Sequence, residues 1–253
     1  MAYSQTPVNF RRPFSYIMDK DLKAQFEQHY VTSEEPWNYN GSGSEKLRFK
    51  RAIEIAKQFV PAPDLIVDVG CSQGQFTGLL AGYANQTVAI DISSTALSRC
   101  EENIQSKFKN IRFLESGLAD LKLPDESVDV IFYLDGIDSH LIKGDALDET
   151  IKRTHQVLKD KGIIIFTDFM HYRDFPLFRK RVSSFGLDVV LDERLNDKLW
   201  FHVRSWFKVI SHLSWVKNML ASESVAAFLG RISALRGEGG SKHICIVAQK
   251  NKS

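Results

Sequence analysis

The feature that most constrains this chain is the stretch 65–77, LIVDVGCSQGQFT, in which an apolar run ends in an acid and a glycine-containing turn. Its β-branched residues predict a strand, and the helical spacing of Phe76, Leu79 and Leu80 predicts a helix after the turn. Glycines let the backbone approach a ligand closely, and the first turn of a helix offers free N–H groups. The stretch therefore predicts a strand, a ligand-binding loop and a helix.

The rest of the chain alternates strand and helix patterns with short connections, which is typical of a parallel sheet covered on both faces. Ser44 is the expected cap of a helix that ends before Pro61, and Ser93 or Ser94 caps the helix after the second strand. Further helices are expected near residues 19–30, 145–158 and 176–185. Strands are expected at 65–69, 87–90, 111–115, 128–133, 163–166, 187–191 and 243–248.

The composition is that of an ordinary globular protein, with 43% hydrophobic and 25% charged residues in 253 and a net charge of +2. This charge gives no general polycationic character of the kind that nucleic-acid binding favours. Cys71, Cys100 and Cys245 are widely spaced and form no metal-binding pattern, so they are expected to be reduced and buried. No signal peptide or membrane-spanning run is visible, which predicts a cytoplasmic protein without a transmembrane segment.

Two common nucleotide loops are excluded by the spacing of the turn. A dinucleotide-binding loop needs G-x-G-x-x-G, and Gly70 is followed at those positions by Ser72 and Gln75. A phosphate-binding P-loop needs Gly-Lys-Ser/Thr, which is absent.

The stretch resembles the first motif of class I S-adenosylmethionine-dependent methyltransferases, acid-x-Gly-x-Gly-x-Gly, with Asp68, Gly70, Ser72 and Gly74 in order. Asp91 lies 23 residues after Asp68, where this family has the acid that holds the ribose hydroxyls. Residues 121–131 and 157–163 resemble the family's approaches to its fourth and fifth strands.

The resemblance implies an α/β fold with a Rossmann-like, seven-stranded, mostly parallel sheet, helices on both faces and an antiparallel last strand. It implies an enzyme of the EC 2.1.1 class that uses S-adenosyl-L-methionine and releases S-adenosyl-L-homocysteine. We expect an N-terminal cap at 1–60, the methyltransferase domain at 61–195 plus 242–250, and a helical insertion at 196–241. The implied cofactor-binding residues of this domain are Asp68, Gly70, Cys71, Gly74, Asp91, Ile92, Gly117, Leu118 and Leu134.

The adenine site departs from the family pattern after the third strand, where many members have an acid. This chain has Ser-Gly-Leu-Ala-Asp at 116–120. The adenine is then expected to be held by the backbone at Gly117 and Leu118, or by Asp120 if the loop is shifted.

The N-terminal region is similar to the start of nodulation-type N-methyltransferases, which methylate an amino group of a chitooligosaccharide. The similarity lies in Phe26-x-x-x-Tyr30, in 35–39 and in 45–49. It implies that Trp37 and Arg48 close over the cofactor, with Arg48 facing its carboxylate. Aromatic residues that pack the helix onto the sheet explain the same pattern equally well.

The acceptor is expected outside the carboxyl ends of the fourth and fifth strands, in 134–140 and 167–172. Asp135 is a candidate for orienting an amine or hydroxyl, and His140 or His171 for general base, with surface histidines as the alternative. Asp135 with Asp168 is loosely similar to metal-dependent catechol-type enzymes. The rest of that metal signature is missing, so no metal is expected.

Several acceptor classes are disfavoured by what the sequence lacks. No Asn/Asp-Pro-Pro-aromatic motif for methylating base amino groups follows the fourth strand, and no Pro-Cys nucleophile for cytosine is present. A small molecule, a sugar or a lipid-linked sugar remains as the acceptor, through nitrogen or oxygen. The alternatives are a non-catalytic scaffold subunit with this fold, and an RNA or protein methyltransferase.

The segment 196–241 combines aromatic residues with more bases than acids. Its apolar residues recur at helical spacing, as in Val225, Leu229 and Ile232. It is interpreted as a substrate lid, a dimer face, a surface that meets lipid or an anionic glycan, or a helical hairpin packed on the sheet edge.

Overall fold

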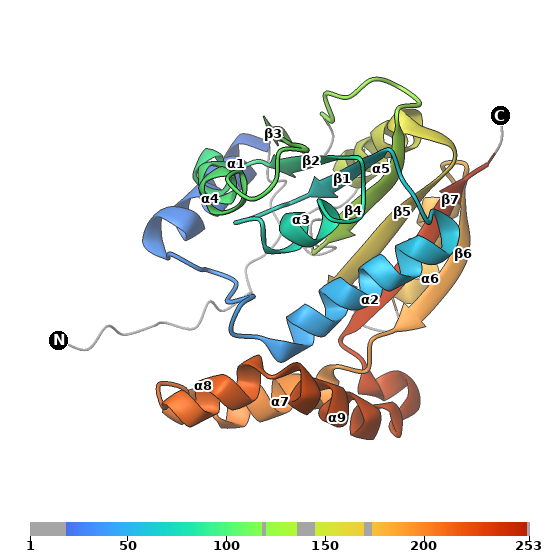
Figure 1. The fold of residues 1–253 in the computed structure, drawn as a ribbon. Helices are drawn as coiled ribbons and strands as arrows, with labels where there is room; N and C mark the ends of the chain where they lie inside the picture. The colour runs from blue at the N-terminus through green and yellow to red at the C-terminus, as the bar shows by residue number, and fades with distance from the viewer. Residues whose placement is uncertain (1–18, 118–119, 136–144, 170–173, 252–253) are drawn as a thin grey trace.

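The computed structural model of the chain describes residues 19–117, 120–135, 145–169 and 174–251, and its centre is one seven-stranded sheet with helices on both faces (Figure 1). The strand order is β3-β2-β1-β4-β5-β7-β6, and every pair is parallel except those that β7 makes with β5 and β6. The predicted Rossmann-like fold with an antiparallel last strand is confirmed. The strands are β1 Leu65–Val69, β2 Gln86–Asp91, β3 Ile111–Glu115, β4 Val128–Leu134, β5 Leu158–Phe169, β6 Leu187–Arg194 and β7 His243–Lys250.

The central strands are apolar along their whole length because both of their faces are covered. Along β4, Val130 and Phe132 face the core shared with the second and third helices, whereas Ile131 and Tyr133 face the core on the opposite side. The helices that cover the sheet are α1 Asp19–Thr32, α2 Gly43–Phe59, α3 Gln75–Leu80, α4 Ser94–Ile104, α5 Asp145–Val157 and α6 Phe175–Ser183.

The starts of α2 and α4 show how far local sequence signals predict where a helix begins. Ser93 caps α4 as predicted, because its Oγ accepts a hydrogen bond of 3.0 Å from the Ala96 N–H. The predicted cap Ser44 of α2 is wrong: Ser42 has this role and accepts from the Glu45 N–H at 3.3 Å. Gly43 then lies in the first turn, where a Cβ would collide with the carbonyl oxygen of Ser222. The start of α2 is therefore fixed by a neighbour 179 positions further along the chain (222 − 43).

Strand β5 is longer than predicted. Residues 159–162 read as a polar turn with a glycine, and Leu158 as the end of the preceding helix. Leu158 nevertheless already pairs with Val128 of β4, and the register shifts before Val130 pairs with Ile163. The bulge absorbs the turn-like residues into the strand. The three cysteines are free and buried, as expected.

Between β6 and β7 lies a separate helical layer, which Figure 1 shows below α2 and away from the sheet. Asn196 and Ser241 close the base of this layer, since the Ser241 Oγ accepts from the Asn196 N–H at 2.8 Å. Lys50 pairs with Glu223 at 2.6 Å and ties the layer to α2. The elements of this layer are α7 Lys198–Trp206, η1 Lys208–Ile210, α8 Ser214–Ala221, α9 Glu223–Ala234 and η2 Gly237–Gly240.

The helical layer has a small core of its own, with Trp200 at its centre and Val216, Leu220 and Ala226 around it. Among the described residues, no helix combines the length and the apolarity that crossing a bilayer would require. The cytoplasmic location expected from the sequence stays a prediction.

Replacing Trp200 tests whether this small core holds the layer in place. Trp200 is 1% exposed, so Trp200→Ala is expected to lower the free energy of unfolding by about 3–5 kcal/mol through lost burial and a cavity. Trp206, in the same helix, is 72% exposed, and Trp206→Ala is expected to change it by less than about 0.5 kcal/mol. Urea denaturation of both variants measures the difference, and equal losses would contradict this account of the layer.

Candidate functional site

The loop between β1 and α3 folds back over the end of β2. Gly70, Ser72 and Gly74 have φ angles of 80°, 51° and 87°, all in the left-handed region. The N–H groups of Gly70 and Cys71 both donate to the Ile90 carbonyl, at 2.8 and 2.9 Å. Ser72 therefore adopts the backbone that the middle glycine of the resembled motif supplies, and its N–H is held by Asp91 at 2.9 Å.

Gly74 is required by packing as well as by its backbone angle. A Cβ at this position would lie 2.8 Å from the Sγ of Cys100 and 3.0 Å from the Cδ1 of Ile104, both on α4. The structure therefore explains this glycine through the contact between loop and helix. Its predicted contact with the cofactor remains a prediction.

Asp91 ends β2 and is 6% exposed. Its Oδ2 accepts from the Ser72 N–H and its Oδ1 from the Ser93 N–H, both at 2.9 Å. Burial raises the pKa of Asp91 to about 6, against the opposite effect of these backbone donors. A carboxylate has about four acceptor positions, so it retains capacity for hydroxyl donors such as a ribose diol.

Asp68 lies in β1 and is also buried, and its Oδ2 accepts from the Thr77 hydroxyl at 2.6 Å. Burial raises the pKa of Asp68 to about 7, and the nearby Asp91 carboxylate adds to the shift. A cation in front of Asp68 would favour its ionised form. The Oε1 of Gln75 is a second buried acceptor beside it, without a hydrogen-bond partner among the described residues.

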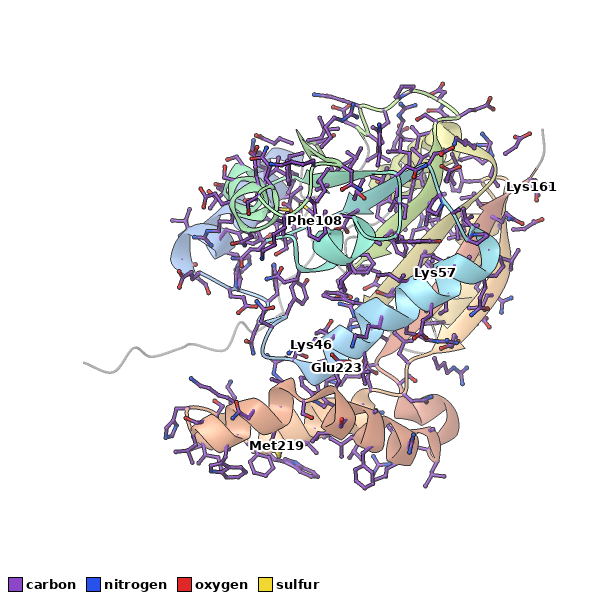
Figure 2. The ribbon with its side chains drawn as sticks, viewed as in Figure 1. Lys46, Lys57, Phe108, Lys161, Met219 and Glu223 are labelled. Atoms are coloured by element: carbon purple, nitrogen blue, oxygen red, sulfur yellow. The ribbon has the colours of Figure 1, made fainter. Side chains whose placement is uncertain are left out.

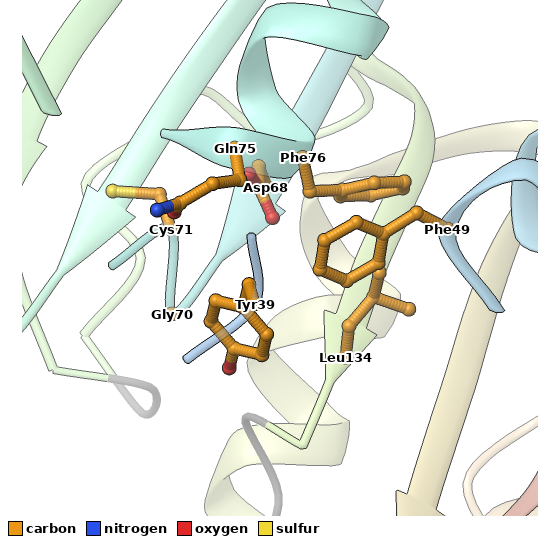
Figure 3. A pocket seen from close by; sticks show the side chains of 8 residues that line it. All are labelled: Tyr39, Phe49, Asp68, Gly70, Cys71, Gln75, Phe76 and Leu134. Atoms are coloured by element: carbon orange, nitrogen blue, oxygen red, sulfur yellow. The ribbon is translucent and has the colours of Figure 1, made fainter. Parts of the chain in front are cut away.

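These acceptors border a small cavity, drawn in Figure 3. In Figure 3, Asp68 and Gln75 lie on one side, and Tyr39 lies on the other side, on the segment before α2. The cavity thus combines a polar wall from the β1 loop with an aromatic wall from the N-terminal part of the chain. Its lining consists of Tyr39, Phe49, Asp68, Gly70, Cys71, Gln75, Phe76 and Leu134.

The N-terminal aromatic residues pack around α1. Trp37 lies against Phe26 and His29, and its Nε1 donates to the Tyr30 hydroxyl at 2.8 Å. Tyr30 is 2% exposed, and its pKa is raised by burial and by the nearby Asp91 carboxylate. Trp37 was the predicted cofactor contact, but Tyr30 is the residue that lies near Asp91 at the end of β2. These contacts do not test whether Trp37 touches the cofactor, so that contact remains a prediction.

Arg48 of α2 is buried at the centre of an ionic network. Its guanidinium donates to the Glu45 carboxylate at 2.5 and 2.8 Å, to Asp135 Oδ2 at 2.6 Å and to the Thr167 hydroxyl at 2.6 Å. Burial alone would lower the pKa of Arg48, but the Asp135 and Glu45 carboxylates outweigh it and raise the pKa. These bonds use four of the five N–H groups of the guanidinium. One N–H of the guanidinium is therefore left for the expected contact between Arg48 and the cofactor carboxylate.

Asp135 follows β4 at a left-handed φ of 58°, and its N–H donates to the Thr167 carbonyl at 2.8 Å. Its Oδ1 is buried without a hydrogen-bond partner among the described residues and lies 3.6 Å from the Nε2 of His243. The Nδ1 of His243 is hydrogen-bonded to Asp197. Glu45, Arg48, Asp135, His243 and Asp197 thus form one continuous charge row.

The sequence analysis missed His243 and Asp197. Because β7 returns antiparallel to β5, His243 pairs with Phe169 and so lies at the carboxyl ends of the parallel strands. Burial would lower the pKa of His243, but the hydrogen bond that it donates to Asp197 and the charge of Asp135 raise it. Burial alone would raise the pKa of Asp197, whereas its hydrogen bond to His243 lowers it. Only the pairing of two antiparallel strands reveals this dyad, and no local motif marks it.

The remaining predicted residues divide into two groups. Ile92 and Gly117 are half-buried at the ends of β2 and β3. Leu118, His140 and His171 lie outside the described residues. The described part of the chain contains no group of three or more His, Cys, Asp or Glu residues that would suit a metal ion.

A comparison with known families matches residues 67–166 to the family described as "Methyltransferase domain". A probable S-adenosylmethionine-dependent methyltransferase of Mycobacterium tuberculosis is 27% identical over 143 residues, which cover 53% of this chain and 48% of that protein. Phosphoethanolamine N-methyltransferase 1 of Arabidopsis thaliana is 33% identical over 69 residues, 26% of this chain and 14% of that protein. The chain spans about half the length of the first of these relatives.

Among solved structures, N-methyltransferase NodS from Bradyrhizobium japonicum in complex with S-adenosyl-L-homocysteine has a TM-score of 0.63 and 13% identity, covering 91% of this chain and 99% of its own. The cyclase SpnF has a TM-score of 0.58 and 13% identity, covering 80% and 82%. Phosphoethanolamine N-methyltransferase 2 of Haemonchus contortus has a TM-score of 0.57 and 14% identity, covering 81% and 53%. At these identities the likeness concerns the fold.

The pKa of Asp91 predicts how binding of S-adenosylhomocysteine depends on pH. A protonated carboxyl offers fewer acceptor positions, so affinity should fall as the pH drops through about 6. Asp91→Asn is expected to bind about 10- to 100-fold more weakly at pH 8. Below pH 6, the affinity of the wild-type chain should fall more steeply than that of the variant, by up to about tenfold per pH unit.

Isothermal calorimetry at several pH values measures this effect. Asp188→Asn is the matched control, because Asp188 is an exposed carboxylate on β6. Equal pH profiles for the wild-type chain and Asp91→Asn would contradict the assigned role of Asp91.

The charge row predicts a strong dependence of stability on Arg48. Arg48→Met leaves the buried Glu45 and the partly buried Asp135 without their cation, so the free energy of unfolding should fall by about 3 kcal/mol at pH 7. Arg48→Met/Asp135→Asn should recover part of this loss. The control Arg51→Met breaks a half-buried pair with Glu193 and should lower the free energy of unfolding by about 1 kcal/mol or less. Additive losses in the double variant, measured by urea denaturation, would show that the two residues are not coupled.

Proposed function

We propose that this chain, whose residues 67–166 are a methyltransferase domain of the S-adenosylmethionine-dependent class, transfers a methyl group from that cofactor to nitrogen or oxygen of a small-molecule or glycan-type acceptor. The observation that carries the proposal is Asp91. This buried carboxylate stands at the end of β2, with the β1 loop folded onto it and acceptor capacity left for a diol.

The cofactor is proposed to extend from Asp91 across the β1 loop. Its ribose hydroxyls donate to Asp91, and its adenine lies towards Gly117 and Leu134. Its methionine part lies towards Asp68, whose ionised form an ammonium group would favour, since burial has raised the pKa of that carboxyl to about 7. When bound, the cofactor supplies an electrophilic methyl carbon on a positively charged sulfur.

The acceptor is proposed to bind at the end of β4, beside the charge row. The Asp135 Oδ1 is buried and lacks a partner among the described residues, so it suits the N–H or O–H of an incoming acceptor. The acceptor lone pair forms the new bond to the methyl carbon, the sulfur retains the electrons of the broken bond, and the acceptor proton passes to Asp135 or His243. Asp197 holds His243 in place for this role.

The acceptor class rests on the charge row together with the relatives. Phosphoethanolamine N-methyltransferases and an N-methyltransferase are among the similar proteins, and an O-methyltransferase domain is among the similar structures. An acceptor with a hydrogen-bond donor, either an amine or a hydroxyl, fits the unpaired Asp135 oxygen. The expected general base His140 lies outside the described residues, and His243 offers a base within them.

A non-catalytic role is the second candidate. SpnF shares the fold and is described as a cyclase, so the fold also occurs in a protein that is not described as a methyltransferase. Cofactor binding alone therefore does not establish methyl transfer. The deciding experiment measures both binding and transfer.

The test incubates the full chain with methyl-labelled S-adenosylmethionine and separate pools of amines, alcohols and glycans. The wild-type chain should transfer label to at least one pool. Asp135→Asn should lower kcat about a hundredfold while S-adenosylhomocysteine still binds. His243→Asn keeps a donor for Asp197 and should abolish the rise of kcat with pH through the histidine pKa, which lies above its ordinary value of about 6.5.

Asp188→Asn, at an exposed carboxylate on β6, is the matched control and should behave as the wild-type chain does. Binding of S-adenosylhomocysteine without transfer to any pool would favour the non-catalytic role. Absence of binding would overturn the proposal altogether.

A further inference from the structure

The helical layer of α7, α8 and α9 exposes an unusual amount of apolar surface. Twelve large apolar side chains are exposed within the described residues, and seven of them lie in the short segment 206–235. Trp206 is 72% exposed and Leu235 is 86% exposed. A cluster of this kind marks a binding surface more often than a scattered exposed residue does. We call this set the apolar face: Trp206, Val209, Leu213, Trp215, Phe228, Ile232 and Leu235.

The apolar face is separate from the core of the layer. Phe228, Ile232 and Leu235 follow one another at spacings of four and three, which places them on one side of α9. Ala226 and Ser233 of the same helix are buried on its other side. Figure 2 shows rings projecting from the outer edge of the layer, where Met219 is labelled, on the side away from the sheet. No other described element covers this face.

Unpaired cations accompany the apolar face. Residues 198–236 contain six lysines and arginines and one acid, Glu223, which is already paired with Lys50. Four of the bases are exposed and form no ion pair with any described residue: Lys208, Lys217, Arg231 and Arg236. The helical layer therefore exposes both large apolar side chains and unpaired cations.

We propose that the apolar face docks on an anionic lipid surface. Helices that lie in a membrane interface bury Trp, Phe and Leu among the lipids and place Lys and Arg against anionic head groups. Both halves of this pattern are present here. A second copy of the chain would bring two positive surfaces together. A nucleic acid would match the charge but leave Val209, Ile232 and Leu235 without apolar contacts.

Docking would bring the acceptor end of the site close to the lipid. The layer starts after Asp197 and ends before His243, so both ends of it are anchored in the charge row. Phe201 of α7 lies 5.5 Å from the His243 ring, measured between ring centroids. The layer that docks is thus in direct contact with the carboxyl ends of the strands, whereas its apolar face is turned away from them. The docking itself does not depend on the proposed methyl transfer.

The test is co-sedimentation of the purified full chain with vesicles of phosphatidylcholine, with or without 30 to 40% phosphatidylglycerol. The wild-type chain should bind the anionic vesicles at least about tenfold more tightly than the neutral ones, and high salt should weaken this binding. Tryptophan emission should shift to the blue when anionic vesicles are added, because Trp206 and Trp215 leave water.

Two double variants separate the apolar and the charged contributions. Trp206→Ser/Phe228→Ser and Lys208→Glu/Arg231→Glu should each lower the vesicle affinity at least about tenfold. The matched control is Leu177→Ser/Lys180→Glu on α6, where Leu177 is 71% exposed and Lys180 is also exposed. The control should bind as the wild-type chain does, and circular dichroism checks that all variants are folded.

Four outcomes would overturn the proposal. The first is absence of binding to anionic vesicles, and the second is an equal loss of binding in the α6 control. The third is a dimer in light scattering that Trp206→Ser/Phe228→Ser dissociates, which would assign the apolar face to a second copy of the chain. Tighter binding to RNA than to anionic vesicles would assign the charges to a nucleic acid instead. Each of these results is independent of whether S-adenosylhomocysteine binds.

Discussion

The ion pair between the buried Arg48 and the partly buried Asp135 joins three parts of the chain. Arg48 comes from α2, Asp135 follows β4, and Thr167 of β5 completes the guanidinium contacts. On the other side, His243 lies 3.6 Å from Asp135 and is held by Asp197, where the helical layer begins. Desolvating so many charges is unfavourable unless each has a partner. The positions of α2, the sheet and the helical layer therefore depend on one another at this point.

Much of the sheet and of the cofactor loop was predictable because their signals are local. The strand at 65–69, the turn at Gly70 and the cap at Ser93 depend on neighbouring residues in the sequence. Asp91 was predicted from the family resemblance, and the parallel pairing of β1 and β2 brings its carboxylate to the same edge of the sheet as the β1 loop. The left-handed Ser72 shows that this loop geometry survives without its middle glycine, because the Asp91 carboxylate holds the serine N–H.

The residues of the proposed acceptor end could not all be predicted, because their contacts join parts of the chain that are far apart in the sequence. Asp197 and His243 meet across the whole helical layer, and the cap of α2 depends on Ser222. No periodicity or motif reports such contacts, because they arise from the antiparallel return of β7 and from the packing of α9 on α2. Arg48 and Asp135 were both recognised as functional candidates, but their pairing was not. Glu45 was missed, since it reads as an ordinary surface residue one turn earlier on the helix. The position of Tyr30 beside Asp91 was not predicted, because it depends on where α1 packs.

The charge row crosses the boundary of the family match. Residues 67–166 contain the cofactor loop, Asp91 and Asp135, whereas Arg48, Asp197 and His243 lie outside that range. Arg48, Asp197 and His243 therefore belong to parts of the chain that the family match does not cover, and the charge row joins them to Asp135 of the matched part. The apolar face also lies outside the matched residues and is joined to the charge row through Asp197 and His243. Recognition of the acceptor and docking on a surface would then be properties of one structural unit, and a change in the packing of α7–α9 would affect both.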